Sequence, residues 1–244
     1  MIARPKNPLA DHYDDLYRGS GFGDAPAFYE WILRIAQPPM KGRVLDLGCG
    51  RGGAMAALGD AGLRGVGLDF STVALEESRE RTPSLPHVRG DGTRLPFADH
   101  SFDTILNLGN LEHFDDWVAG MAEMRRVLSP EGRAWILLPN LFYSGVIWRI
   151  CRGGEGANHH QPIDRFATRE EWRAWLDWGG LNVVRVIPYH KGKWWKRLLP
   201  SAWAWHFLYE CRRSEPSSAP PPPAPLERRA ATLGDRVENK SSSD

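Results

Sequence analysis

Residues 44 to 53 combine a carboxylate, several glycines and the start of a helix, which together can hold a nucleotide-like ligand. Their sequence is Val-Leu-Asp-Leu-Gly-Cys-Gly-Arg-Gly-Gly, and an Ala/Leu-rich helical run follows from Ala54. The apolar residues predict a short buried strand, and the glycines predict a turn whose backbone N–H groups point at a ligand. Glycine suits such a turn because the ligand approaches the backbone closely and the backbone angles are unusual.

The spacing of these glycines is compatible with two kinds of cofactor. Gly48, Gly50 and Gly53 satisfy the G-x-G-x-x-G pattern of dinucleotide-binding proteins. Asp46, followed by glycines at alternate positions from 48 to 52, fits a different cofactor. The turn therefore locates a binding site without identifying its occupant.

Two further carboxylates follow the next two predicted strands. Asp69 stands 23 residues after Asp46, at a strand end where a carboxylate can accept both hydroxyls of a ribose. The alternative is that Asp69 merely precedes a helix cap at Ser71. Asp91, followed by Gly92, closes the third strand and can accept from the exocyclic amine of adenine, although alone it is more typical of a turn.

The elements that must position these residues alternate between short apolar runs and helical stretches. Strands are predicted at 44–47, 65–68, 87–89, 102–107, 133–139, 181–187 and 205–211, and helices at 25–36, 54–61, 72–81, 117–128 and from 168 to the glycines at 179 and 180. The last helix begins with a Thr-x-x-Glu capping box at Thr168. Such alternation predicts an α/β protein whose parallel sheet carries helices on both faces and binds ligands at the carboxyl ends of its strands.

Composition excludes several broad classes of protein. The charges nearly balance, with 31 basic and 30 acidic residues in a 244-residue chain, which argues against a general nucleic-acid binder. The three cysteines form no C-x-x-C pair, so neither a zinc site nor a disulfide framework is indicated, and a reducing, cytoplasmic setting is expected. The N-terminus lacks the apolar run of a signal peptide, and no stretch approaches the roughly 18 apolar residues of a membrane span.

Motifs downstream of the carboxylates connect the chain to a known family. They are Leu95-Pro96-Phe97 with Ser101-Phe102-Asp103, Asn107 followed by Glu112-His113, and Ser129-Pro130-Glu131-Gly132. With the glycine turn, they closely resemble class I S-adenosylmethionine-dependent methyltransferases, above all the small-molecule "type 11" branch that includes ubiquinone- and menaquinone-biosynthesis enzymes. The resemblance is specific over about residues 43–139 and looser to about residue 187. The last motif departs from the family's Lys/Arg-Pro-Gly-Gly, which affects a turn and not the cofactor site.

The resemblance implies S-adenosylmethionine as the cofactor and a doubly wound, Rossmann-like sheet of seven strands, mostly parallel with the last strand antiparallel. The implied cofactor-binding residues are Asp46, Gly48, Gly50, Gly52, Asp69, Phe70, Asp91, Gly92, Asn107 and Tyr17. In the family, the glycine loop holds the methionine and ribose portions, and the fourth strand ends beneath the sulfonium. Tyr17 and Tyr13 lie in a polar segment that resembles a lid over the cofactor, the alternative being surface tyrosines of a loose arm.

The same resemblance divides the chain into three parts. Residues 1–40 are expected to form a lid and a helix, and residues 41–213 the methyltransferase domain. Within that domain, residues 140–167 are interpreted as a glycine-rich insertion on the acceptor side. Residues 214–244 contain a proline run and a polar end, and we expect them to be disordered because they offer little apolar area to offset the entropy of ordering.

Three histidines are candidates for a general base. His113 follows the fourth strand at the mouth of the expected site, and its ordinary pKa suits the deprotonation of a hydroxyl. His159 and His160 lie in the insertion. The alternatives are a structural Glu-His pair and solvated loop histidines. Relatives in the ubiquinone pathway bind a metal through Glu-x-x-Glu-His, but Gly109 occupies the first glutamate position here, so we predict no metal.

Residues 191–207 mix basic side chains with Trp and Leu. A connection between the last two strands, with its tryptophans packed on the sheet, is the favoured interpretation because the run is short and contains Pro200. Weak contact with a membrane surface, which would suit a lipid-linked acceptor, is the alternative.

The sequence therefore predicts methyl transfer from S-adenosylmethionine to a small-molecule or lipid-linked acceptor, at oxygen rather than at carbon or nitrogen. Two alternatives stay open at this point. One is an NAD-dependent oxidoreductase that shares the glycine loop, and the other is a non-catalytic, cofactor-binding partner subunit.

Overall fold

A computed structural model describes residues 8–19, 25–154, 161–192 and 194–229. The helices of this part are α1 (Pro8–Gly19), α2 (Pro26–Ala36), α3 (Gly53–Asp60), α4 (Thr72–Arg81), α5 (Trp117–Val127), α6 (Ser144–Cys151) and α7 (Arg169–Trp178), with short 3₁₀ turns η1 (Leu111–His113), η2 (Trp194–Leu198) and η3 (Ser201–Trp203). The strands are β1 (Arg43–Leu47), β2 (Arg64–Asp69), β3 (His87–Arg89), β4 (Phe102–Leu108), β5 (Leu128–Pro139), β6 (Ile163–Phe166), β7 (Leu181–Tyr189), β8 (His206–Arg213) and β9 (Leu226–Arg229).

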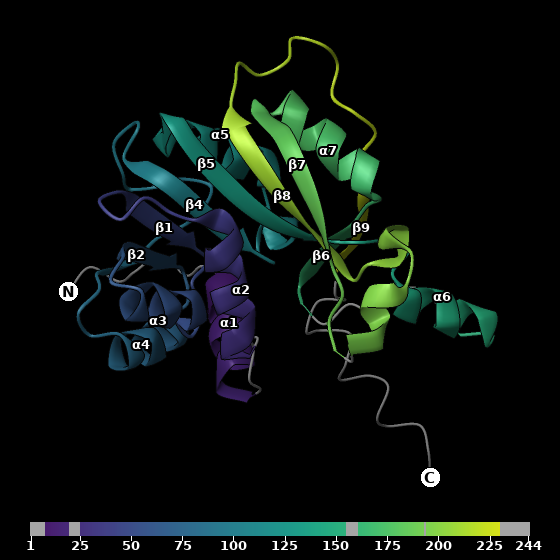
Figure 1. The fold of residues 1–244 in the computed structure, drawn as a ribbon, viewed down its shortest axis with the longest axis horizontal. Helices are drawn as coiled ribbons and strands as arrows, with labels where there is room; N and C mark the ends of the chain where they lie inside the picture. Colours follow the sequence, from purple (N-terminus) through teal and green to yellow (C-terminus); the bar gives the residue numbers. More distant parts are fainter. Residues whose placement is uncertain (1–7, 20–24, 155–160, 193, 230–244) are drawn as a thin grey trace.

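Seven of these strands form one twisted sheet in the order β3-β2-β1-β4-β5-β8-β7 (Figure 1). The strands from β3 to β5 pair in parallel, and β8 pairs antiparallel with both β5 and β7. The predicted fold class, a doubly wound sheet whose last strand is antiparallel, is therefore confirmed. The strand order reverses between β1 and β4, and α/β sheets bind ligands beside the carboxyl ends of strands at such a reversal.

Helices cover both faces of the sheet because its central strands bury apolar side chains on both sides. Along β1, Leu45 packs with residues of α5 and α7, whereas Val44 packs with residues of α2 and α3. Strands buried on both faces carry near-continuous apolar runs rather than alternating ones, which explains why β1, β4 and β5 are evident in the sequence.

Side chains at helix ends set the boundaries that the sequence predicts. Thr168 and Glu171 form the expected capping box at the start of α7, and Ser71 caps α4 by accepting from the backbone N–H of Ala74 at 3.1 Å. The helix predicted to reach Leu128 ends instead at Val127. Leu128 belongs to β5, where it pairs with Phe102 of β4.

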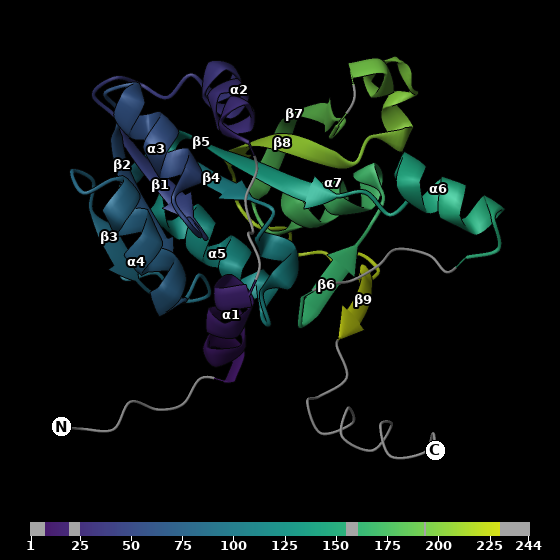
Figure 2. The same ribbon diagram turned by 90° about the horizontal axis from the view of Figure 1, so that it is seen from below.

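The region predicted as an acceptor-side insertion contains α6 and β6, which lie to one side of the main sheet (Figure 2). His159 and His160 fall outside the described residues. None of the helices in the described segments combines the length and apolar character needed to cross a bilayer.

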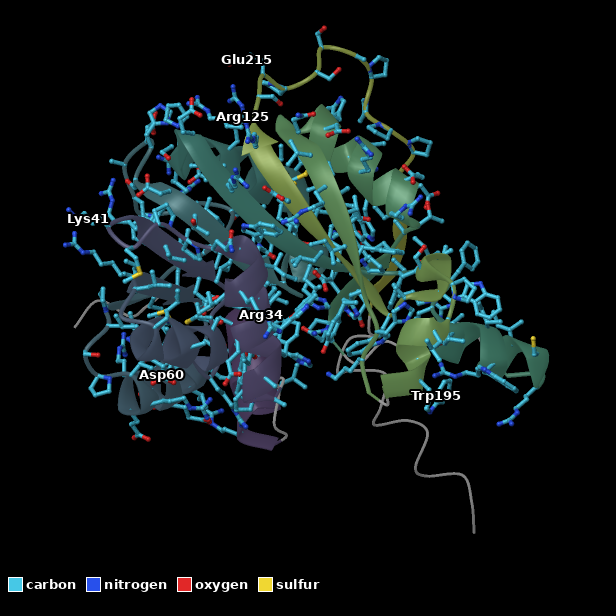
Figure 3. The ribbon with its side chains drawn as sticks, in the orientation of Figure 1. Arg34, Lys41, Asp60, Arg125, Trp195 and Glu215 are labelled. Atoms are coloured by element: carbon cyan, nitrogen blue, oxygen red, sulfur yellow. The ribbon has the colours of Figure 1, made fainter. Side chains whose placement is uncertain are left out.

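The expectation of disorder from residue 214 is wrong for residues 214–229. β9 pairs antiparallel with β6, and the proline-rich stretch before it lies along α7, where the indole N–H groups of Trp175 and Trp178 donate to the carbonyls of Pro223 and Ala219. Proline lacks an N–H but keeps its carbonyl, so a proline-rich segment can be fixed by donors from a neighbouring helix. At the start of the segment Arg125 forms an ion pair with Glu215 at 2.7 Å, and the two side chains lie together at one edge of the molecule (Figure 3).

Candidate functional site

A cavity of about 700 Å³ opens at the carboxyl ends of β1, β2 and β4. One part of its wall comes from the glycine turn and from Asp69 and Phe70, and another from α1 through Tyr13 and Tyr17. The remaining wall is formed by α2, the turn after β4, the end of β5, the α6 and β6 regions, and residues at and before the start of β8. Segments distant in sequence thus enclose one space at the position where α/β sheets bind ligands.

The glycine turn between β1 and α3 brings its backbone to the cavity surface. Gly50 has a φ of 50°, and a Cβ at this position would lie 2.9 Å from the hydroxyl of Tyr17. Its backbone N–H donates to Oδ2 of Asp69 at 2.9 Å. Gly48 also lines the cavity, whereas Gly52 does not, because it packs against Ser78 of α4.

Asp69 holds the turn and faces the cavity at the same time. Its second oxygen accepts from the N–H of Ser71 at 2.9 Å. Burial raises the pKa of Asp69 to about 6, although the N–H donors of Ser71 and Gly50 oppose this shift. Because each carboxylate oxygen has two lone pairs, both oxygens can still accept a hydroxyl from a ligand.

Asp46 lies beneath the turn and outside the cavity wall. Burial, reinforced by the charge of Asp69, raises the pKa of Asp46 to about 7. Its Oδ2 is enclosed and has no hydrogen-bond partner among the described residues. Asp46 therefore supports the site from below and does not touch the cavity surface.

Three other predicted cofactor residues are not brought to the cavity. Asp91 uses Oδ1 to accept from both the N–H and the hydroxyl of Thr93 at 2.8 Å, which is the turn role that its sequence context also allows. Gly92 packs against the ring of Phe114. Asn107 is fully buried and its Oδ1 accepts from the N–H of Leu111 at 3.0 Å, so it orders the turn after β4.

The N-terminal tyrosines lie on a docked helix rather than on a loose arm. Tyr13 is buried, and its ring contacts that of Phe70 with a centroid separation of 5.0 Å. Burial raises the pKa of Tyr17 well above its usual value. On the same helix, Asp14 accepts from the hydroxyl of Ser71 at 2.5 Å and from the N–H of Val73 at 3.3 Å. α1 thus covers the cavity with its tyrosines and attaches to α4.

His113 lies at the centre of a hydrogen-bonded cluster in the cavity wall. Its Nδ1 lies 2.6 Å from the carbonyl oxygen of Ile163 and 3.1 Å from Oδ1 of Asp164. Its Nε2 lies 2.8 Å from the amide of Gln161, whose Oε1 accepts from the hydroxyl of Tyr13 at 2.7 Å. The cluster joins α1 to the end of β4 and to β6.

Burial lowers the pKa of His113, but the carboxylates of Glu112 and Asp164 more than offset this and leave it raised. Burial also raises the pKa of Glu112 to about 7, and one oxygen of this side chain has no hydrogen-bond partner within the described segments. The Ile163 carbonyl fixes a proton on Nδ1 of the neutral ring, so the basic lone pair lies on Nε2, where it accepts from the Gln161 amide.

Several cavity residues were not predicted from the sequence. Gln161 and Asp164 come from the insertion, and His206 starts β8. Nδ1 of His206 is enclosed with no hydrogen-bond partner in the part of the chain that the structure describes, and burial lowers the pKa of this ring to about 3. The Gln-x-x-Asp spacing of residues 161 and 164 matches no functional motif. These residues reach the cavity through long-range contacts of β6, which pairs with β9 and is joined to the turn after β4 through Arg165. Across residues 8–19, 25–154, 161–192 and 194–229, no three His, Cys, Asp or Glu side chains are arranged to hold a metal ion.

Comparison with known proteins decides the family. A family model described as "Methyltransferase domain" matches residues 45–136. A curated relative from Corynebacterium kroppenstedtii, named demethylmenaquinone methyltransferase, is 43% identical over 185 residues, which cover 72% of this chain and 80% of the relative. The chain belongs to the class I S-adenosylmethionine-dependent methyltransferases. A second relative of this methyltransferase, from Beutenbergia cavernae and with the same name, is 48% identical over 91 residues, which cover 37% of the chain and only 38% of the relative.

Solved structures show the same fold as this methyltransferase. The CcbJ methyltransferase from Streptomyces caelestis superposes with a TM-score of 0.63 at 17% identity, over 85% of this chain and 98% of that one. The 1,6-didemethyltoxoflavin-N1-methyltransferase of Burkholderia thailandensis, solved with bound 1,6-didemethyltoxoflavin and S-adenosylhomocysteine, gives a TM-score of 0.58 at 20% identity over 85% of each chain.

Proposed function

We propose that this methyltransferase transfers the methyl group of S-adenosylmethionine to a ring carbon of a demethylmenaquinone-type quinol. The observation that carries the proposal is a cavity in which the glycine turn and Asp69 share a space with an aromatic, histidine-containing wall. The names of two relatives supply the class of acceptor.

The turn side of the cavity fits S-adenosylmethionine. Gly50 leaves open the space that a Cβ would fill, and Asp69 keeps lone pairs free for ribose hydroxyls. Phe70 offers an aromatic ring beside Asp69, and Tyr17 covers the turn from α1. Gly52 and Asn107 contribute by fixing the backbone near these contacts. When bound, the cofactor supplies an electrophilic methyl group on a sulfonium, and the chain's task is to align a nucleophile with it.

The opposite wall fits a flat aromatic acceptor. Tyr143, Phe166 and Trp205 line it, whereas Tyr29 lies against Gly53 at the glycine turn. Aromatic rings of this kind pack against one another in offset or edge-on arrangements. The ammonium of Lys191 lies 4.3 Å from the ring centroid of Trp205, which places a cation beside the space where a quinol would carry developing negative charge.

His113 is the residue that we propose as general base. Asp164 and the Ile163 carbonyl hold its ring and favour the Nδ1–H tautomer. Nε2 then takes a proton from an acceptor hydroxyl when that hydroxyl displaces the Gln161 amide, which lies 2.8 Å from it. The raised pKa makes His113 a stronger base in its neutral form. His159 and His160 remain sequence-based candidates for the same step.

Removal of this proton activates two positions of a quinol. The negative charge is shared between the oxygen and the neighbouring ring carbon, so the same deprotonation precedes either O- or C-methylation. After C-methylation the ring carbon must also lose its hydrogen as a proton, and the oxygen regains one, which restores the aromatic quinol. The sequence alone predicts oxygen as the atom that receives the methyl group. The relatives' name favours carbon, because menaquinone differs from demethylmenaquinone by a methyl group on the ring.

The test is turnover of the full chain with S-adenosylmethionine and a reduced, short-chain demethylmenaquinone analogue. We expect a product whose new methyl protons resonate in the aryl-methyl region of the NMR spectrum, and a methoxy resonance would show O-methylation instead. His113→Ala should lower kcat by about 100-fold. Asp164→Asn should lower kcat less, and it should move the acidic limb of the pH profile to lower pH, because the Asp164 carboxylate raises the pKa of His113. Turnover of His113→Ala within a few-fold of wild type would eliminate it as the base. Tight S-adenosylhomocysteine binding without turnover of any quinol would favour a non-catalytic role.

A further inference from the structure

Exposed apolar side chains are concentrated on two short segments. Six of the nine exposed large hydrophobic residues in the described part of the chain lie between positions 142 and 150 or between 195 and 203. They are Phe142, Trp148, Ile150, Trp195, Leu198 and Trp203. Trp148 is 62% exposed and Leu198 is 77% exposed. Large apolar surface of this kind marks an interaction site when it is contiguous.

The two segments form one surface, which we call the tryptophan face and define by these six residues. The side-chain amide of Asn140, just before α6, donates to the carbonyls of Ala202 and Ala204 at 2.8 Å and so ties the two segments together. Phe142 and Ile147 of the first segment and Trp203 of the second line the same apolar groove of about 460 Å³. α6 and the segment that carries Trp195 lie side by side at the same end of the molecule (Figures 1–3).

The two stretches that carry the tryptophan face have basic but no acidic side chains. Residues 140–154 and 189–206 contain no Asp or Glu, although the whole chain has 30 acidic residues and a net charge of only +1. Among the side chains that the structure describes, the basic ones in these two stretches are Arg149, Arg152, Lys191 and Lys196. Glu170, the acidic residue that lines the apolar groove, is paired with Arg169 at 2.8 Å.

The combination of exposed tryptophans and cations indicates a lipid surface rather than a protein partner. The guanidinium of Arg152 lies 5.2 Å from the ring centroid of Trp148, so an aromatic ring and a cation lie next to each other on this face. Trp favours the headgroup level of a bilayer, and Arg and Lys extend their charged ends to anionic headgroups. The cores of protein interfaces, by contrast, are depleted of Lys.

We propose that the tryptophan face binds the headgroup–acyl boundary of an anionic phospholipid bilayer. The face adjoins the cavity, because Tyr143, Arg149 and Lys191 of the same two stretches belong to the cavity wall. If the acceptor is the lipid-linked quinol of the proposed function, it enters from the bilayer beside this face. That last step rests on the proposed function, whereas binding of the bilayer does not.

The experiment is co-sedimentation of the full chain with vesicles, in the absence of cofactor and acceptor. Vesicles of equal parts phosphatidylglycerol and phosphatidylcholine should bind the chain at least tenfold more strongly than pure phosphatidylcholine vesicles. We expect Trp148→Ser with Leu198→Ser, and separately Arg152→Glu with Lys196→Glu, each to weaken binding to the anionic vesicles at least tenfold. Neither pair lines the cavity, so unchanged S-adenosylhomocysteine affinity would show that these variants are folded.

Met40 and Lys41 provide a matched control away from this face. Met40 is 66% exposed, and Lys41 lies on the opposite side of the molecule from Trp195 (Figure 3). Met40→Ser with Lys41→Glu changes the same kinds of side chain and should leave vesicle binding unaltered. Equal loss in this control, or no binding of the wild-type chain to anionic vesicles, would overturn the proposal. Self-association of the wild type that Leu198→Ser abolishes, without vesicle binding, would assign the face to a second copy of the chain.

Discussion

Protonation of the buried Asp46 carboxylate makes stability depend on pH. Its pKa is raised to about 7 by burial and by the charge of Asp69. Between about pH 4 and pH 7 the folded chain therefore holds a proton that the unfolded chain has released. The free energy of unfolding consequently falls as the pH rises through this range, by on the order of 4 kcal/mol from Asp46 alone.

Asp46→Asn should remove this component and leave the free energy of unfolding less dependent on pH between 4 and 7. The measurement is urea unfolding at several pH values in this range. Asp60→Asn, at the exposed end of α3, is the control and should retain the wild-type slope. The same slope for wild type and Asp46→Asn would show that Asp46 is ionised in the folded protein.

Gly50 has a role in ligand binding that can be separated from its role in the backbone. Gly50→Ala places a methyl group 2.9 Å from the Tyr17 hydroxyl and into the turn that faces the cavity. We expect the affinity for S-adenosylhomocysteine, measured by calorimetry, to fall at least about tenfold, because a displacement of roughly an ångström disrupts such contacts.

Gly62→Ala is the matched control, since Gly62 has a φ of 68° and a Cβ at this position would meet no described atom within 4 Å. It should cost about 1 kcal/mol of stability through the left-handed backbone and leave the ligand affinity unchanged. Equal effects of the two substitutions on affinity would mean that backbone strain alone explains the loss at Gly50.

At the scale of elements, α1 depends on its contacts with the start of α4. Asp14→Ala removes the acceptor for the hydroxyl of Ser71 and the N–H of Val73. The loss of one capping interaction costs about 1 kcal/mol, so we expect amide exchange in α1 to accelerate and S-adenosylhomocysteine affinity to fall roughly fivefold.

Asp15→Ala changes the next residue on the same helix and removes only an exposed ion pair with Arg18. Exposed pairs contribute little, and both measurements should therefore match the wild type. If Asp14→Ala also matches the wild type, α1 does not act as a lid over the cofactor.

Elements whose signals are local could be predicted from the sequence, and elements defined by distant pairing could not. The strand ends at Leu47 and Asp69 follow from apolar runs that stop at a glycine and a carboxylate, and the start of α7 follows from its capping box. The pairing of β6 with β9 joins residues 163–166 to residues 226–229, across a sequence separation that no local pattern reveals. Gln161 and Asp164 were missed for that reason.

The misplacement of Asp91 has a different physical cause. Its spacing from β3 matches the family pattern, but the hydroxyl and N–H of Thr93 occupy one of its oxygens. A neighbour two residues away decides the orientation of this side chain, and the sequence is compatible with either role.

At the scale of the whole molecule, the segment after β8 connects the outer helix to the cavity. Arg165 of β6 is only 3% exposed and forms an ion pair with Glu227 at 2.7 Å, while Trp175 and Trp178 of α7 donate to the same segment. A chain that ends at Arg213 loses all of these partners. We expect it to be less stable by at least about 2 kcal/mol, because a buried charge and two indole donors lose their protein partners.

A chain that ends at Arg229 is the control for this truncation and should retain the wild-type melting temperature. Calorimetric melting and ligand titration of both chains provide the measurement. Since β6 carries Asp164 beside His113, the shorter chain should lose turnover while binding S-adenosylhomocysteine with near-normal affinity. Loss of cofactor binding together with turnover would mean that the two walls of the cavity do not fold independently.

The position of β8 between β5 and β7 has a consequence for the order in which the molecule is completed during synthesis. β7 emerges from the ribosome before β8, but the hydrogen bonds that hold β7 in the sheet are made with β8. The half of the sheet from β3 to β5 can form as soon as residue 139 has been made. β7 has no strand to pair with until β8 is complete at residue 213. Contacts of long sequence separation form slowly, so a nascent chain should acquire its cofactor wall well before its acceptor wall.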